Sequence, residues 1–204
     1  LADRYRIPVL ILGDGAIGQM MEKVDLRSFQ PDITPKPWAT VGHRDRRTNN
    51  IVKTLYLKPE ELEELNNNLQ AKYREIASRE TAWEECLTED ADIVLVAYGI
   101  MARIAQSAMN SAREQGLRVG MIRPKTLWPF PRVPFQDAAK RVQQFLVLEL
   151  SAGQMVEDVL LAVEHKKPVS FFGRTGGMIP STKEVLNKVV SSIRPTGMKG
   201  ERQQ

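Results

Sequence analysis

The sequence predicts an α/β protein of three layers, in which a mostly parallel five-stranded sheet lies between two layers of helices. The main observation is that short apolar runs alternate with longer helical patterns over residues 91–194. Strands joined by helices pair in parallel through right-handed crossovers. The composition agrees, because 42% hydrophobic and 26% charged residues in a chain of 204 are typical of a globular protein.

The amino-terminal quarter is expected to be an extension ahead of this domain. Residues 7–12 (IPVLIL) form a continuous apolar run with β-branched members, which predicts a buried strand. Residues 22–48 include three prolines within seven positions, and this density predicts an irregular connector. Residues 51–57 alternate loosely, which predicts a strand at the edge of a sheet.

A long amphipathic helix is expected to begin at Pro59, in the first-turn position where proline is tolerated, with four glutamates close behind it. Its apolar positions recur at steps of three or four residues or their multiples, at Leu62, Leu65, Leu69, Tyr73, Ile76 and Trp83. Cys86 is assigned to the same acidic helix as a structural thiol.

The alternating pattern then defines the main domain. The expected strands are residues 91–98, 117–122, 145–150 and 169–172, and the expected helices are 101–115, 135–144, 154–164 and 183–193. Short right-handed crossovers with one change of direction predict the spatial order 117–122, 91–98, 145–150, 169–172, with 51–57 antiparallel at the edge beside 117–122. Residues 195–204 lack an apolar face and are expected to be mobile.

Composition excludes several classes of function. One cysteine cannot form an intramolecular disulfide, an iron–sulfur cluster or a cysteine-rich zinc site, and two histidines, His43 and His165, cannot build a metal cage. The net charge of +4 is weak for nucleic-acid binding. No apolar run is long enough to cross a membrane, and no charged-then-apolar leader opens the chain, so we expect a cytoplasmic protein.

The segment Gly13-Asp14-Gly15 allows three interpretations. With Gly18 it fits a dinucleotide-binding pattern, but prolines occupy the place of the second strand. With Asn49 and Asn50 it fits the thiamine diphosphate signature, in which Asp and Asn oxygens hold Mg²⁺, although the spacer is too long. The interpretation we favour is a tight turn between a strand and a helix.

Loops at the expected carboxyl ends of the strands are candidate contact sites, since doubly wound sheets place their functional surfaces there. The turn before residue 154 puts N–H groups at a helix start, which attract anions; the alternative is an ordinary turn capped by Ser151. Candidate ligand or interface residues are Arg123, Trp128, Gly153, Gln154, Arg174, Gly176 and Gly177. No catalytic, secure cofactor-binding or metal-binding residue can be assigned.

The segment of residues 123–131 (RPKTLWPFP) is predicted to be a rigid docking surface. Its three prolines restrict the backbone, so little entropy is lost when a partner binds. Trp128 and Phe130 supply the large aromatic area that is enriched at interface hot spots. The alternative is that both aromatic side chains pack back onto their own domain.

Three motifs carry a family resemblance. RPKTLWPFP at 123–131, LELSAGQMVEDV at 148–159 and GRTGGMIP at 173–180 resemble segments of 2-oxoacid:ferredoxin oxidoreductase alpha subunits. PVLILGDG at 8–15, through Met21, also matches, as the last strand of a preceding domain. The resemblance covers nearly the whole chain and is greatest to the 2-oxoisovalerate (2-ketoisovalerate) or 2-oxoglutarate type.

This resemblance implies a transketolase carboxyl-terminal-like domain at residues 91–194. Residues 1–50 would be the remnant of a pyrimidine-type domain with the proline-rich connector, and 51–90 an edge strand and long helix. The family oxidatively decarboxylates a 2-oxoacid with coenzyme A, giving acyl-CoA, CO₂ and reduced ferredoxin. Its thiamine diphosphate, Mg²⁺ and iron–sulfur clusters would belong to the complete complex and not to this chain.

The same resemblance implies partners: a beta subunit and ferredoxin-like subunits, with possible self-association, and neither nucleic acid nor membrane. This chain alone is expected to be inactive, with a structural and assembly role. Two alternatives remain, a free-standing regulatory or ligand-binding α/β module and a complete thiamine-dependent subunit.

Overall fold

The structure is a computed structural model that describes residues 1–26, 28, 30, 35–42 and 47–193. The chain divides into two compact units. The first comprises Leu1–Leu12 and Met21–Ile76, and the second comprises Gly13–Met20 with the chain from Ala77 onward. The expected mobile tail, residues 195–204, lies outside the described residues.

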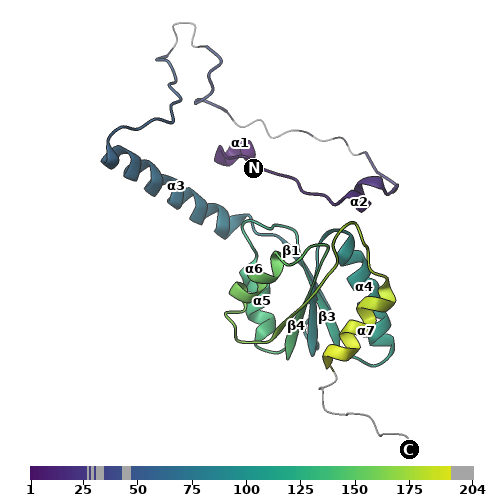
Figure 1. The fold of residues 1–204 in the computed structure, drawn as a ribbon. Coiled ribbons are helices and arrows are strands. Elements are labelled where there is room, and N and C mark those ends of the chain that lie inside the picture. The colour runs from purple at the N-terminus through teal and green to yellow at the C-terminus, as the bar shows by residue number, and fades with distance from the viewer. Residues whose placement is uncertain (27, 29, 31–34, 43–46, 194–204) are drawn as a thin grey trace, which may run out of the picture. The chain divides into compact units, whose positions relative to one another are not determined.

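The second unit contains a five-stranded sheet in the order β1-β3-β2-β4-β5 (Figure 1). Neighbouring strands β3-β2-β4-β5 are all parallel, and β1 is antiparallel to β3. The strands are β1 (Trp83–Cys86), β2 (Ile93–Val96), β3 (Val119–Pro124), β4 (Gln144–Glu149) and β5 (Val169–Gly173). The predicted order of the four parallel strands is therefore confirmed.

Helices cover both faces of the sheet, which confirms the three-layer architecture (Figure 1). One layer consists of α4 (Gly99–Glu114) and α7 (Thr182–Ile193), and the other of α5 (Arg132–Ala139) and α6 (Met155–Ala162). The central strand β2 is buried at all four positions: Ile93 and Leu95 pack towards α4, and Val94 and Val96 towards α5 and α6. This burial on both faces explains why the central strands are continuous apolar runs.

The edge strand was predicted in the wrong place. Residues 51–57 form no strand, and Ile51 and Leu57 are 83% and 85% exposed. The antiparallel edge strand is β1, whose residues were assigned to the preceding helix because Trp83 continued the helical spacing. The helix α3 (Pro59–Arg79) ends before that strand begins. Cys86 therefore lies on a strand, where it packs half-buried against the α4 layer.

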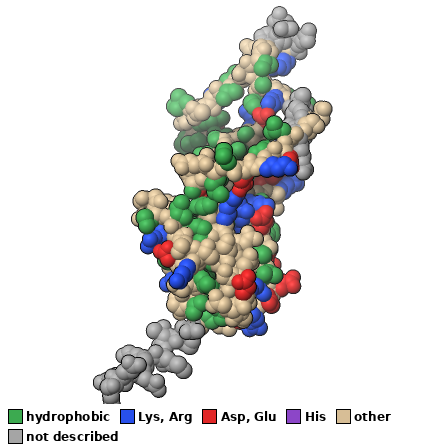
Figure 2. Space-filling model, turned by 90° about the vertical axis from the view of Figure 1, so that its right-hand side faces the viewer, with side chains coloured by type: hydrophobic (Ala, Val, Ile, Leu, Met, Phe, Trp, Pro, Cys, Tyr) green, Lys and Arg blue, Asp and Glu red, His purple; other side chains and the backbone are tan. Residues whose placement is uncertain are grey.

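The predicted buried strand at residues 7–12 is also wrong. These residues have no strand partner within the described chain, and Leu10 and Ile11 are 77% and 96% exposed. A strand is stabilised by pairing with a neighbour, which an apolar sequence alone does not provide. The short helices α1 (Ala2–Tyr5) and α2 (Gly15–Gln19) flank this run. Apolar side chains are visible on the surface of the amino-terminal part in Figure 2.

Among the described residues, none of the helices has the length and apolar character required to cross a lipid bilayer. The longest, α3, has 21 residues but carries charged side chains along its length.

A substitution at Gly120 of β3 tests how tightly this strand packs against the turn at Leu87 and Thr88. A Cβ added there would lie 2.6 Å from the Leu87 carbonyl oxygen and 2.9 Å from the Thr88 Cα, both of which are backbone atoms. We expect Gly120→Ala to lower the free energy of unfolding by about 1–3 kcal/mol through overpacking, measured by urea denaturation. Gly18→Ala is the matched control, because a Cβ at Gly18 meets nothing within 4 Å. Equal stability of the two variants would contradict this packing.

Candidate functional site

The carboxyl edge of the parallel sheet is the candidate site, and its central feature is the buried side chain of Glu149. This residue ends β4 and is only 1% exposed. By alternation along β4 it points to the same layer as Phe145 and Val147, where α6 begins. A buried carboxyl group is costly unless hydrogen bonds satisfy it.

The first residues of α6 supply those hydrogen bonds. The carboxylate oxygens of Glu149 accept from the backbone N–H groups of Gln154 (3.1 Å), Met155 (3.1 Å) and Val156 (3.0 Å). The Ser151 hydroxyl donates to the same carboxylate at 2.9 Å. Every one of these partners is a donor, so both oxygens act as acceptors. The positive end of the α6 dipole adds to this stabilisation.

Ser151 was considered as the cap of this helix, and that expectation is wrong. Its hydroxyl accepts from the Gly153 N–H at 3.1 Å, while Glu149 caps the helix amides. The signal in the sequence was a single glutamate at the end of an apolar strand, two residues before a Ser-Ala-Gly turn. The N–H groups near Gly153 and Gln154 do attract an anion, but that anion belongs to the chain itself.

Tyr98, which follows β2, is influenced by the negative charge of Glu149. Burial raises the pKa of the Tyr98 hydroxyl, and the negative charge of Glu149 raises that pKa further. Tyr98 packs half-buried against the α5 and α6 layer. Its hydroxyl therefore stays protonated at neutral pH.

A second carboxylate, that of Asp14, occupies the start of α4 in the same way. Its Oδ2 accepts from the Ile100 N–H at 2.7 Å, and its Oδ1 accepts from the Ile17 N–H at 2.8 Å. The favoured interpretation of Gly13-Asp14-Gly15 was a strand-to-helix turn; Asp14 does begin α2, but no strand precedes it. Asn50 donates to backbone carbonyls of Pro37 and Ala39 in the first unit.

The two candidate arginines lie on different strands. Arg123 is on β3 and pairs with Glu84 of β1 at 3.2 Å, whereas Arg174 follows β5 and pairs with Glu184 at 3.6 Å. Because β2 and β4 lie between β3 and β5, roughly 14 Å separates the two positions at normal strand spacing. The structure does not bring them together.

Both arginines are tied to local partners. A hydrogen bond from Lys125 lowers the pKa of Glu84, and the charges of Lys125 and Arg123 add to this effect. The pKa of Glu184 is lowered mainly by hydrogen bonds from Ser181, with Arg174 contributing less. The backbone N–H of Arg174 donates to the Glu149 carbonyl, which links β5 to the same buried centre.

The remaining candidate residues lie in separate loops and do not form one site. Trp128 is 61% exposed in the loop after β3, whereas Phe130 stacks on Phe135 with ring centroids 5.2 Å apart. Phe130 therefore packs onto its own domain, whereas the Trp128 side chain is largely exposed. Gly176 and Gly177 lie in an open loop, because a Cβ on either would meet nothing within 4 Å.

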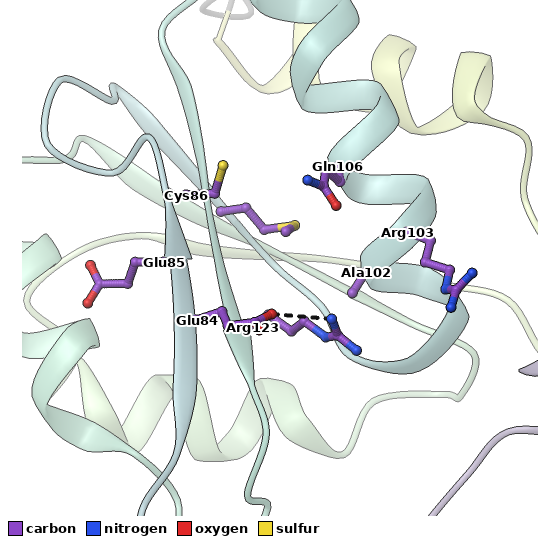
Figure 3. A pocket seen from close by; sticks show the side chains of 8 residues that line it. Glu84, Glu85, Cys86, Ala102, Arg103, Gln106 and Arg123 are labelled. Carbon is purple, nitrogen blue, oxygen red and sulfur yellow. Dashed lines mark hydrogen bonds and ion pairs between the residues drawn. The ribbon is translucent and has the colours of Figure 1, made fainter. Parts of the chain in front are cut away.

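A hollow of about 260 Å³ lies away from these loops, between β1, β3 and α4 (Figure 3). Arg123 is the one candidate residue that lines it, and its pairing with Glu84 is drawn there. The lining residues are Glu84, Glu85, Cys86, Ala102, Arg103, Gln106, Met121 and Arg123. Its charges are mixed and exposed.

Within the described residues there is no cluster of His, Cys, Asp or Glu that could hold a metal ion. His43 is not among the residues described, and His165 lies in the turn after α6.

The chain is similar in sequence to known proteins and to one family model. Residues 91–185 match the family model described as pyruvate:ferredoxin oxidoreductase core domain II. The chain is 41% identical to ketoisovalerate oxidoreductase subunit VorB of Methanothermobacter marburgensis, over 93% of this chain and 53% of that protein. It is 29% identical to 2-oxoglutarate synthase subunit KorA of the same organism, over 93% of this chain and 58% of that protein.

A solved structure shares the fold. The 2-oxoglutarate:ferredoxin oxidoreductase from Magnetococcus marinus, with 2-oxoglutarate, coenzyme A and succinyl-CoA bound, superposes with a TM-score of 0.58 at 18% identity. The match covers 68% of this chain and 24% of that chain. The expected three-layer α/β architecture with a mostly parallel five-stranded sheet is confirmed. The chain spans about half the length of the curated relatives it matches.

Glu149→Gln tests the buried centre. The glutamine is isosteric, but its NH₂ group would face N–H donors and its side chain would lack the negative charge at the start of α6. We expect the free energy of unfolding to fall by about 2–4 kcal/mol in urea denaturation. Glu157 is an exposed residue in the first turn of the same helix, and Glu157→Gln should change the free energy of unfolding by about 0.5 kcal/mol or less. Losses of similar size in both variants would contradict a special role for Glu149.

Proposed function

Because this chain is a homologue of 2-oxoacid:ferredoxin oxidoreductase subunits, we propose that it is the carboxyl-terminal domain of the alpha subunit of such an enzyme. The complete enzyme removes CO₂ from a 2-oxoacid, transfers the acyl group to coenzyme A and passes the electrons to ferredoxin. The role of this domain is structural: it holds the subunit together and presents a surface to partner subunits in a cytoplasmic complex.

The observation that carries this proposal is that the chain's own carboxylates occupy the helix starts at the carboxyl edge. In doubly wound sheets these positions are where phosphate groups bind. Glu149 takes N–H groups at the start of α6, and Asp14 takes the N–H group of Ile100, the second residue of α4. An edge closed in this way suits a domain that supports assembly better than one that binds a diphosphate.

Asp14 and Asn50, the residues that matched the thiamine diphosphate signature, do not fit a Mg²⁺ site in the described part of the chain. Both oxygens of Asp14 are directed at N–H donors, which is the opposite of what a metal ligand requires. The Asn50 side-chain amide is directed at backbone carbonyls of its own unit. We therefore propose that the cofactor, its metal ion and the iron–sulfur clusters belong to other domains or subunits of the complex.

The substrate branch that we propose is the 2-oxoisovalerate type. Identity is 41% with the ketoisovalerate subunit and 29% with the 2-oxoglutarate subunit, over the same share of this chain. A free-standing regulatory module is the alternative function. Copurification of the chain with a beta-type subunit distinguishes them, since a free-standing module has no need of that partner.

Trp128 is the proposed anchor for a beta-type subunit. The segment that carries it is held to its own domain, because the Lys125 N–H donates to the Ala82 carbonyl at 2.9 Å and the Ala82 N–H donates to the Thr126 hydroxyl at 3.0 Å. Pro129 and Pro131 on either side of Phe130 are buried. The exposed indole is therefore presented by a backbone that is already ordered.

We expect Trp128→Ala to weaken association with a purified beta-type subunit at least tenfold, in a titration followed by calorimetry, while the melting temperature changes little. Truncating a tryptophan anchor typically costs a complex about 2 kcal/mol or more. Leu161→Ala is the control, because Leu161 is a similarly exposed apolar residue (56%) in the last turn of α6. A lowered melting temperature with unchanged affinity would refute docking through Trp128.

A further inference from the structure

The position of Asp14 becomes informative once the path of the chain through the sheet is followed. From β2 the chain crosses to β3 on one side, and from β3 it passes back over β2 to β4 on the other. The direction of winding therefore changes between β2 and β4. In open α/β sheets, the crevice outside the carboxyl ends at such a point is the usual place for a ligand.

α4 follows β2 and begins at this edge of the sheet, where α2 of the segment Gly13–Met20 contacts it. The Asp14 carboxylate joins α4 to α2 through the Ile100 and Ile17 amides, and 86 positions separate Asp14 from Ile100. α2 and α4 lie next to each other in Figure 1, in the same compact unit.

Gly99, the first residue of α4, fits this contact in two independent ways. Its φ angle is +58°, a backbone conformation that glycine adopts without strain. A Cβ at this position would overlap Oδ2 of Asp14, so any other residue would push the carboxylate away. Glycine is thus required both by the turn into α4 and by the approach of Asp14.

We propose that the start of α4 serves as the attachment site for the chain's own segment Gly13–Met20, with the Asp14 carboxylate in the place of a ligand anion. The segment clusters with the α/β unit, although the residues on both sides of it, up to Leu12 and from Met21, cluster with the first unit. Asp14 is therefore a positioning residue that holds α2 against the start of α4 within this unit. The inference shares the contact between Asp14 and Ile100 with the proposed function, but its test needs no partner or substrate.

The test is amide hydrogen exchange on the whole 204-residue chain, with Asp14→Ala against wild type. We expect exchange of the Ile100 amide and of the α2 amides to accelerate at least tenfold, while the Leu95 amide in the core of β2 keeps its rate. Asp25→Ala is the matched control, because Asp25 is an exposed carboxylate with only a 3.7 Å ion pair to Lys23. Unchanged exchange at Ile100, or equal acceleration at Leu95, would overturn the proposal.

A second variant keeps the test decisive. Gly99→Ala should also accelerate exchange of the α2 amides, by displacing Asp14, but it should have no further effect on them when combined with Asp14→Ala. This non-additivity is expected because both changes break the same contact. Additive effects on the α2 amides would show that Gly99 acts on α4 alone and would overturn the proposed attachment.

Discussion

A buried carboxylate without a cation partner is the interaction on which this α/β unit depends. Taking an ionised side chain out of water costs several kcal/mol, and here the cost is offset by backbone N–H groups, a serine hydroxyl and the dipole of α6. The Glu149 side chain binds the start of α6, and its carbonyl accepts from Arg174 after β5. One residue therefore fixes the end of β4, the turn that follows it, the first turn of α6 and the exit from β5.

This arrangement explains how a fold that commonly binds ligands can serve a different purpose. At the carboxyl edge, N–H groups at the start of α6 are satisfied from within by Glu149, and one at the start of α4 is satisfied by Asp14. The capping box between Ser181 and Glu184 does the same at the start of α7. What the edge offers to the outside is the exposed Trp128 and open glycine loops, which suit contact with another protein.

The central strands and their order could be predicted from the sequence, but the edge strand and the amino-terminal segment could not. Strands buried on both faces must be apolar throughout, so β2 and β4 were visible as runs, and crossover handedness gave their order. The edge strand β1 has only four residues, exposed at the two middle positions and half-buried at both ends, and this pattern cannot be told from the end of the α3 pattern. The run at residues 7–12 has the composition of a strand but no described partner.

The position of the site could be predicted from the sequence, but the side chains that occupy it could not. The turn before α6 was one of two open interpretations, an anion-attracting helix start or an ordinary turn. The one local signal for the group that fills it was Glu149, five residues before Gln154 at the end of an apolar strand. The contact between Asp14 and Ile100 spans 86 positions and depends on the tertiary fold. Likewise, Arg123 and Arg174 share an edge in sequence reasoning, but the strand order places two strands between them.

The central claim is that internal carboxylates close the carboxyl edge to phosphate-bearing ligands. The most direct measurement is a ¹H–¹⁵N correlation spectrum of the ¹⁵N-labelled chain during titration with thiamine diphosphate and Mg²⁺, followed at the amides of Gln154, Met155, Val156 and Ile100. The account predicts that these four resonances do not move, because their N–H groups already donate to Glu149 and Asp14. Saturable shifts at these amides would show that the edge accepts a diphosphate and would contradict it.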